Sequence, residues 1–119
     1  MEKAIYKINV KHDGKQELFP IHGYIFNFSG LRYGISRNYF FNGKEETGYT
    51  WTITELTTGY SVGCDGKGGK MQETINNFLH AYTYTGDFVT DLVQKAVENY
   101  TGGDANPDLF PKSDLLVAR

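Results

Sequence analysis

The sequence predicts an α+β domain: an antiparallel β-meander of about five strands, followed by two C-terminal helices packed on one face of the sheet. In the first half of the chain apolar and polar side chains alternate with a period of two, which is typical of strands. From Met71 onward apolar residues recur every three to four positions, which is typical of helices. Because the strands come first and the helices last, we expect a layered arrangement rather than alternating β and α units.

The strands are expected where β-rich runs lie between turn residues. Asp13-Gly14 is a strong signal for a two-residue hairpin turn, and Ser29-Gly30 is expected to form another turn. Pro20 should interrupt strand pairing or mark a sheet edge. Residues 38–48 are interpreted as a polar, protruding loop. The expected strands are residues 4–10, 16–19, 23–28, 31–37, 49–56 and 60–64.

Two helices are expected after residue 70. One apolar stripe runs from Met71 to Tyr82, and a second helix begins at Asp87, a favourable N-cap, and ends before Gly102-Gly103. We therefore expect residues 1–103 to form a single α+β domain. Residues 104–119 carry two prolines and are expected to form an irregular C-terminal tail, with Leu109-Phe110 or Leu115-Leu116 as candidate docking residues.

Composition restricts the classes of function. A chain of 119 residues is normally one domain, and its formal charge of −2 argues against a dedicated nucleic-acid binder, which usually has a basic excess. The single cysteine, Cys64, excludes an internal disulfide, so no oxidising compartment is implied. No apolar run approaches the length of a membrane span. We expect a cytoplasmic protein without membrane contact.

The glycine- and lysine-rich stretch at 63–70 resembles a phosphate-binding loop only in composition. A P-loop needs glycine where this chain has Cys64, and Ser or Thr where it has Met71. The stretch is therefore interpreted as the joint between sheet and helix, with Lys67 and Lys70 in water. Loose binding of an anion at the start of the helix remains an alternative.

No catalytic, metal-binding or cofactor site is predicted. Cys64, His12, His22 and His80 do not lie at motif spacing from one another, and Cys64 is most simply a small buried residue. The acidic pairs Glu45-Glu46 and Asp87/Asp91 are explained by a solvated loop and by helix capping. The chain is expected not to be an enzyme, the alternative being an enzyme that uses Cys64 with a histidine.

Two candidate binding surfaces remain. Three consecutive aromatic residues cannot all point inward on one strand, so a protein-binding patch is predicted at Arg37, Tyr39, Phe40, Phe41 and Lys44. A loop that folds these rings back onto the sheet is equally compatible with the sequence. The alternative function is a nucleic-acid-binding module in which aromatic and basic side chains share a sheet face: Arg32, Tyr33, Arg37, Lys67 and Lys70.

The segments WTITELTTGYSV (51–62) and ETINNFLHAY (73–82) resemble many small proteins of bacteriophages and other mobile elements. In those proteins a Trp-x-Ile/Val-Thr strand, a Thr-Gly turn and an aliphatic strand precede a helix. The family includes non-enzymatic inhibitors of host defence, anti-CRISPR proteins among them. The resemblance implies a phage or prophage protein, monomer or homodimer, that occupies a surface of a host protein such as a CRISPR effector nuclease in the bacterial cytoplasm.

Overall fold

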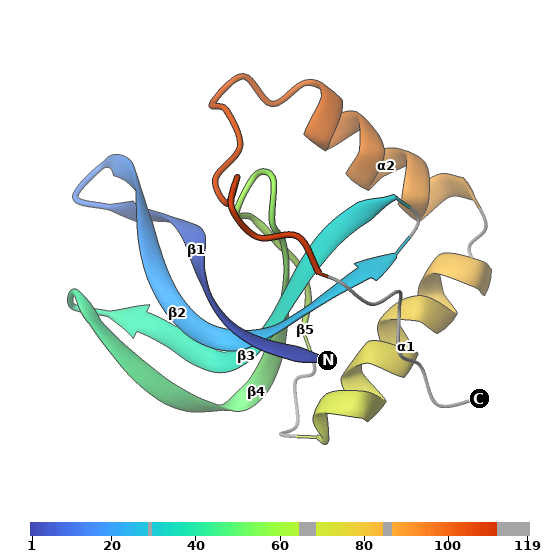
Figure 1. The fold of residues 1–119 in the computed structure, drawn as a ribbon, viewed down its shortest axis with the longest axis horizontal. Coiled ribbons are helices and arrows are strands. Elements are labelled where there is room, and N and C mark those ends of the chain that lie inside the picture. The colour runs from blue at the N-terminus through green and yellow to red at the C-terminus, as the bar shows by residue number, and fades with distance from the viewer. Residues whose placement is uncertain (29, 65–68, 85–86, 112–119) are drawn as a thin grey trace.

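The computed structural model describes residues 1–28, 30–64, 69–84 and 87–111. Within these residues a five-stranded antiparallel sheet of order β1-β2-β3-β4-β5 is followed by two helices, which confirms the α+β architecture (Figure 1). The strands are β1 Glu2–His12, β2 Lys15–Phe28, β3 Leu31–Phe41, β4 Lys44–Glu55 and β5 Ser61–Cys64. The helices are α1 Met71–Tyr84 and α2 Asp87–Glu98.

The sheet divides into two hairpins that diverge. β2 pairs with β1 along residues 15–25, but it pairs with β3 only from Tyr24↔Ile35 to Phe28↔Leu31. β3 in turn continues with β4 as far as Phe41↔Lys44. Beyond the Tyr24–Ile35 pair the β1–β2 hairpin therefore separates from the β3–β4 hairpin, as Figure 1 shows. We call this point of separation the fork.

Both hairpins turn on two residues in the left-handed region. Asp13 and Gly14 have φ of 50° and 78°, and Asn42 and Gly43 have φ of 52° and 77°. Asn-Gly and Asp-Gly favour this conformation, whose twist matches that of the flanking strands. The expectation of a loop at 38–48 is therefore wrong, because residues on either side of Asn42-Gly43 pair as strands. Pro20 lies inside β2 where β3 does not pair with it, at an edge.

One face of the sheet packs under α1, and we call it the helix face. Phe26, Tyr33, Ile35 and Ile53 are buried there with Ile75 of α1. The Tyr33 ring stacks on Phe26 at 5.5 Å and meets Phe78 of α1 edge-on at 5.4 Å. Tyr24 and Phe28 pack against the same cluster, so Tyr24, Phe26 and Phe28 share one face of β2, as alternation along a strand requires.

The opposite, inner face has a second core around Tyr6, with Ile21, Ile25 and Leu56. The Tyr6 ring lies directly on the backbone of two glycines. A Cβ on Gly34 would stand 2.5 Å from Tyr6 Cζ, and one on Gly23 would stand 2.8 Å from Tyr6 Cε1. These positions admit only glycine while the tyrosine keeps its place, since real Cβ contacts are not so short.

Residues 104–111 lie against the inner side of the sheet without forming a helix or strand. The buried Asn106 side chain accepts a hydrogen bond from Lys7 N at 2.6 Å and donates to Lys7 O at 3.0 Å and Leu56 O at 2.8 Å. β1 also meets the β4–β5 turn directly, where Asn9 N donates to Gly59 O. Asn106 thus bridges β1 and the end of β4. Leu109 packs on the inner core, whereas Leu115-Leu116 lie outside the described residues.

Candidate protein-binding surface

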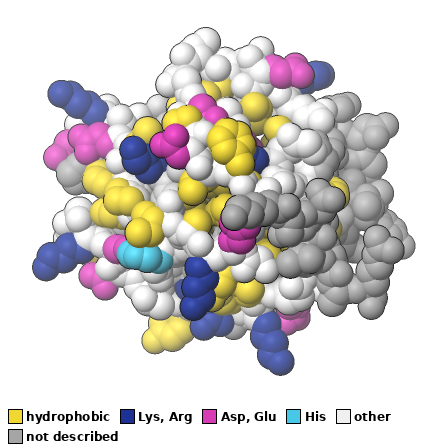
Figure 2. All heavy atoms as spheres, viewed as in Figure 1, with side chains coloured by type: hydrophobic (Ala, Val, Ile, Leu, Met, Phe, Trp, Pro, Cys, Tyr) yellow, Lys and Arg dark blue, Asp and Glu magenta, His cyan; other side chains and the backbone are white. Residues whose placement is uncertain are grey.

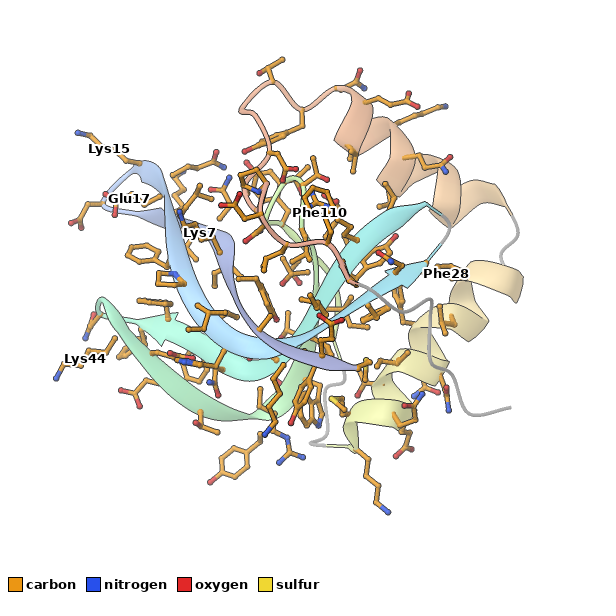
Figure 3. The ribbon with its side chains drawn as sticks, viewed as in Figure 1. Lys7, Lys15, Glu17, Phe28, Lys44 and Phe110 are labelled. Carbon is orange, nitrogen blue, oxygen red and sulfur yellow. The ribbon has the colours of Figure 1, made fainter. Side chains whose placement is uncertain are left out.

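The outer end of the β3–β4 hairpin carries the predicted protein-binding residues. Side chains alternate across a strand, so the three rings separate. Tyr39 and Phe41 are 47% and 62% exposed, whereas Phe40 is half-buried and stacks on Phe19 of β2 at 4.5 Å between ring centroids. Lys44 is exposed at the tip (Figure 3). The structure thus presents two of the three rings outward and uses the third to join the two hairpins.

A register shift in β4 exposes a further ring. Ser36 pairs with Thr52 but Asn38 pairs with Thr47, so residues 48–51 of β4 lie opposite Arg37 alone. Extra residues of this kind bend a strand and redirect its side chains. Tyr49, at the centre of this segment, is 89% exposed. Tyr39, Phe41 and Tyr49 therefore all project from one hairpin.

A cavity of about 650 Å³ opens where the two hairpins part, and we call it the fork cavity. All four long strands contribute to its wall. Ile5, Tyr24 and Trp51 supply apolar side chains, and the remaining lining includes Lys3, His22 and Arg37. Figure 2 shows hydrophobic side chains gathered on the surface between the hairpins, with charged side chains around them.

Four polar residues fasten the two hairpins together at the fork, and we call them the fork clamp: His22, Ser36, Asn38 and Glu45. The His22 N–H donates to Glu45 Oε1 at 2.8 Å, and His22 O accepts from Ser36 Oγ at 2.7 Å. The Asn38 amide donates to Glu45 Oε1 at 2.7 Å, and His22 Nδ1 lies 3.0 Å from Glu45 Oε2. Side chains thus satisfy the backbone groups that β2 would otherwise offer to a neighbouring strand.

The clamp also sets the protonation of its carboxylate. Partial burial by itself would raise the pKa of Glu45, but the hydrogen bonds from His22 N–H, from Asn38 and from the His22 ring, together with the charge on that ring, act in the opposite direction. The net result is a pKa of Glu45 below its ordinary value. The clamp therefore favours the ionised carboxylate.

Arg37 lies over the ring of Trp51 at the cavity wall. Its guanidinium carbon is 4.8 Å from the centroid of the Trp51 ring, and its Nη2 donates to Gly69 O at 3.1 Å. Arg37 Nε and Trp51 Nε1 are both buried and have no hydrogen-bond acceptor among the residues that the structure describes. A buried donor without an acceptor costs roughly 1–3 kcal/mol, so two at one place need an explanation.

The residues of the alternative nucleic-acid surface do not form one exposed sheet face, although Arg37 contacts Gly69, the neighbour of Lys70. Tyr33 has no exposed surface, so its ring cannot stack on a base. Arg32 is turned inward, where its guanidinium donates to Asn106 O, to Leu109 O and to Asp104. Lys70 is exposed before α1, and Lys67 lies outside the described residues. Tyr33 is covered by α1, and Arg32 is covered by the C-terminal segment.

Among the described residues no three His, Cys, Asp or Glu side chains gather in a way that could hold a metal ion. The buried Glu55 is engaged in its own turn, accepting from the N–H groups of Thr57 and Thr58 at 2.8 Å each. The side chains of His12, Cys64 and His80 lie outside the described part of the structure. No helix in the described ranges has the length and apolarity to cross a membrane.

Sequence reasoning singled out Arg37, Tyr39 and Phe41 but not Tyr49, the most exposed ring among the described residues. It also missed Lys3, Ile5, His22 and Trp51 as parts of one cavity. These residues lie on three strands, and only the register and the fork bring them together. Asn42-Gly43 was a signal for the β3–β4 hairpin, but an unbroken register from that turn would set Trp51 opposite Gly34. Only the register shift after Ser36, which no sequence pattern marks, brings residues 48–51 opposite Arg37. No protein-family model, curated protein or solved structure matches this chain.

Proposed function

We propose that this chain is a small non-enzymatic binding protein that acts by occupying a surface of another protein. The observation that supports this proposal is the exposure of three large aromatic side chains, Tyr39, Phe41 and Tyr49, on the single β3–β4 hairpin. Aromatic rings supply much of the energy of protein interfaces, and exposed rings gathered on one element are typical of an interaction site.

The β3–β4 hairpin is fixed in position by contacts with β2. Phe40 stacks on Phe19, and Glu45 accepts hydrogen bonds from His22, so both sides of the hairpin are fixed to β2. A fixed element loses less conformational entropy on binding than a mobile loop, which leaves more of the interaction energy for affinity. Arg37 and Lys44 add positive charge beside the rings and would orient an acidic partner surface.

For the partner, we propose a host defence protein, with a CRISPR effector nuclease as the most concrete candidate. The support is the resemblance of residues 51–62 and 73–82 to small phage and mobile-element proteins. On this proposal the chain is a phage or prophage inhibitor that works in the bacterial cytoplasm and competes for a surface its target needs.

The test is a double variant, Phe41→Ser with Tyr49→Ser, in which neither side chain belongs to either core. We expect at least tenfold weaker binding to purified CRISPR effector nucleases and loss of inhibition in a target-cleavage assay. The matched control is Leu18→Ser, which removes an exposed apolar side chain from the other hairpin and should leave both measurements unchanged. Wild-type binding by the double variant would overturn the role of the hairpin, and a wild-type chain that inhibits no effector would overturn the choice of partner.

A further inference from the structure

The fork cavity is large enough to receive part of a partner molecule. Its volume of about 650 Å³ falls within the range of ordinary ligand sites, roughly 300–1,000 Å³. It opens on the face of the sheet beside the region that α1 covers, between the two hairpins. Its apolar wall is formed by Ile5, which is 55% exposed, and by Tyr24 and Trp51.

The charge of the lining is one-sided. Lys3 and Arg37 contribute permanent positive charge, and no Asp or Glu is among the described residues that line the cavity. The carboxylate of Glu45, which binds the lining residues His22 and Asn38, already accepts hydrogen bonds from both within the fork clamp. The cavity therefore favours a negatively charged occupant over a neutral or positive one.

Hydrogen-bonding capacity points to the same chemistry. Arg37 Nε and Trp51 Nε1 are N–H donors that no acceptor among the described residues satisfies. A guanidinium has five N–H groups in a planar fork that matches a carboxylate, and an indole N–H can only donate. A carboxylate brings two acceptor oxygens, so its chemistry matches that of unsatisfied N–H donors.

We propose that the fork cavity receives an acidic side chain of the partner protein, Asp or Glu, flanked by apolar residues. The carboxylate pairs with Arg37 and Lys3, and the flanking residues lie against Ile5, Tyr24 and Trp51. This inference rests on the proposed function only in that the occupant is a protein segment. The fork cavity and the rings of the β3–β4 hairpin are then two separate parts of one binding surface.

The experiment is a selection of randomised seven-residue peptides displayed on phage, against the wild-type chain with counter-selection against Arg37→Gln. We expect the recovered sequences to be enriched in an Asp or Glu next to an aliphatic or aromatic residue. A synthetic peptide of the recovered sequence should change the fluorescence of Trp51, which is the only tryptophan in the chain. Its amide isostere, with Asn for Asp or Gln for Glu, should bind at least tenfold more weakly.

Matched variants locate the site. Lys3→Gln, at an exposed position, should weaken binding of the peptide several-fold. Lys15→Gln, at the far tip of the same β1–β2 hairpin, should not (Figure 3). Recovered peptides without acidic enrichment, or an isostere that binds equally well, would overturn the proposal. The double variant Phe41→Ser with Tyr49→Ser should still bind the peptide. If the peptide binds as expected but that variant also binds the host protein normally, the proposed function fails and this inference stands.

Discussion

At the scale of single residues, the inner core depends on one tyrosine placed over two glycines. Gly23 and Gly34 leave room for the Tyr6 ring between β2 and β3, and the ring fills the space that two side chains would otherwise occupy. The phenol hydroxyl of Tyr6 is therefore buried as well. Burial raises the pKa of Tyr6 above its ordinary value, because a phenolate would lose its hydration there.

This burial predicts an alkaline limit to stability that Tyr6→Phe removes. In the unfolded chain the phenol ionises near its ordinary pKa of about 10, whereas the folded chain keeps it protonated to higher pH. The unfolded state therefore loses its proton first, and the free energy of unfolding falls as the pH rises above that value. Relative to Tyr6→Phe, the wild type should lose up to about 1.4 kcal/mol per pH unit above pH ~10.

Urea unfolding of the two proteins between pH 8 and pH 11 measures this difference. The other eight tyrosines are present in both chains, so their contributions cancel. Below about pH 9 the difference between the two proteins should be constant. Parallel curves over the whole range would contradict the burial of the phenol as the cause.

At the scale of elements, local patterns predicted most strands and both helices. The alternation in β2 and the apolar stripe from Met71 were sufficient to predict a strand and a helix, because the apolar side chains of each are buried in the same core. The hairpin at Asn42-Gly43 was missed because its β3 arm ends in three consecutive aromatic residues, which hide a period of two. Pro20 likewise suggested an interruption, yet β2 continues because its outer side has no partner at that point.

Because of the fork clamp, the stability of the folded chain should decrease in acid. Because the pKa of Glu45 is lowered in the folded state, its contribution to stability is present above the ordinary glutamate pKa and is lost as the pH falls through the lowered value. Glu45→Gln should therefore be less stable than wild type at neutral pH, and the difference should shrink as the pH falls below about 4.

Thermal unfolding between pH 3 and pH 7 tests the clamp. Glu46→Gln is the matched control, since Glu46 is an exposed neighbour on the same strand for which no clamp contact is present in the described structure. It should keep the acid profile of the wild type. A Glu45→Gln profile that stays parallel to the wild type down to pH 3 would show that the clamp carboxylate does not contribute.

At the scale of the whole molecule, contacts between distant parts of the chain decide both how β1 is held to the end of β4 and the shape of the candidate site. Arg32 of β3 and Asn106 of the C-terminal segment meet through Asn106 O at 2.6 Å, seventy-four positions apart in sequence. No local sequence pattern marks such a pair. From residues 104–111 the sequence could therefore predict only an irregular segment that contains prolines. The fork cavity has the same origin, because its wall takes Lys3, His22 and Arg37 from three different strands.

The bridge that Asn106 makes between β1 and the end of β4 predicts a large effect of one small substitution, Asn106→Ala. The change leaves Lys7 N, Lys7 O and Leu56 O without the partner they share, and water cannot reach the buried position easily. Leaving such backbone groups unsatisfied should lower the free energy of unfolding by roughly 2–4 kcal/mol. Asn99→Ala, at an exposed asparagine just after α2, should change it by less than about 0.5 kcal/mol.

Amide hydrogen exchange distinguishes loss of the contact between β1 and the end of β4 from a general loosening of the fold. In Asn106→Ala the amides of Lys7 and Ala105 should lose protection from exchange. The Lys7 amide donates to the Asn106 side chain, and the Ala105 amide donates to Thr57 O where the C-terminal segment meets the turn after β4. The amides of β3 and β4 at the Ile35–Ile53 pair, on the helix face, should keep theirs. Equal loss of protection at both places would mean that Asn106 supports the whole fold, and not only the contact between β1 and the end of β4.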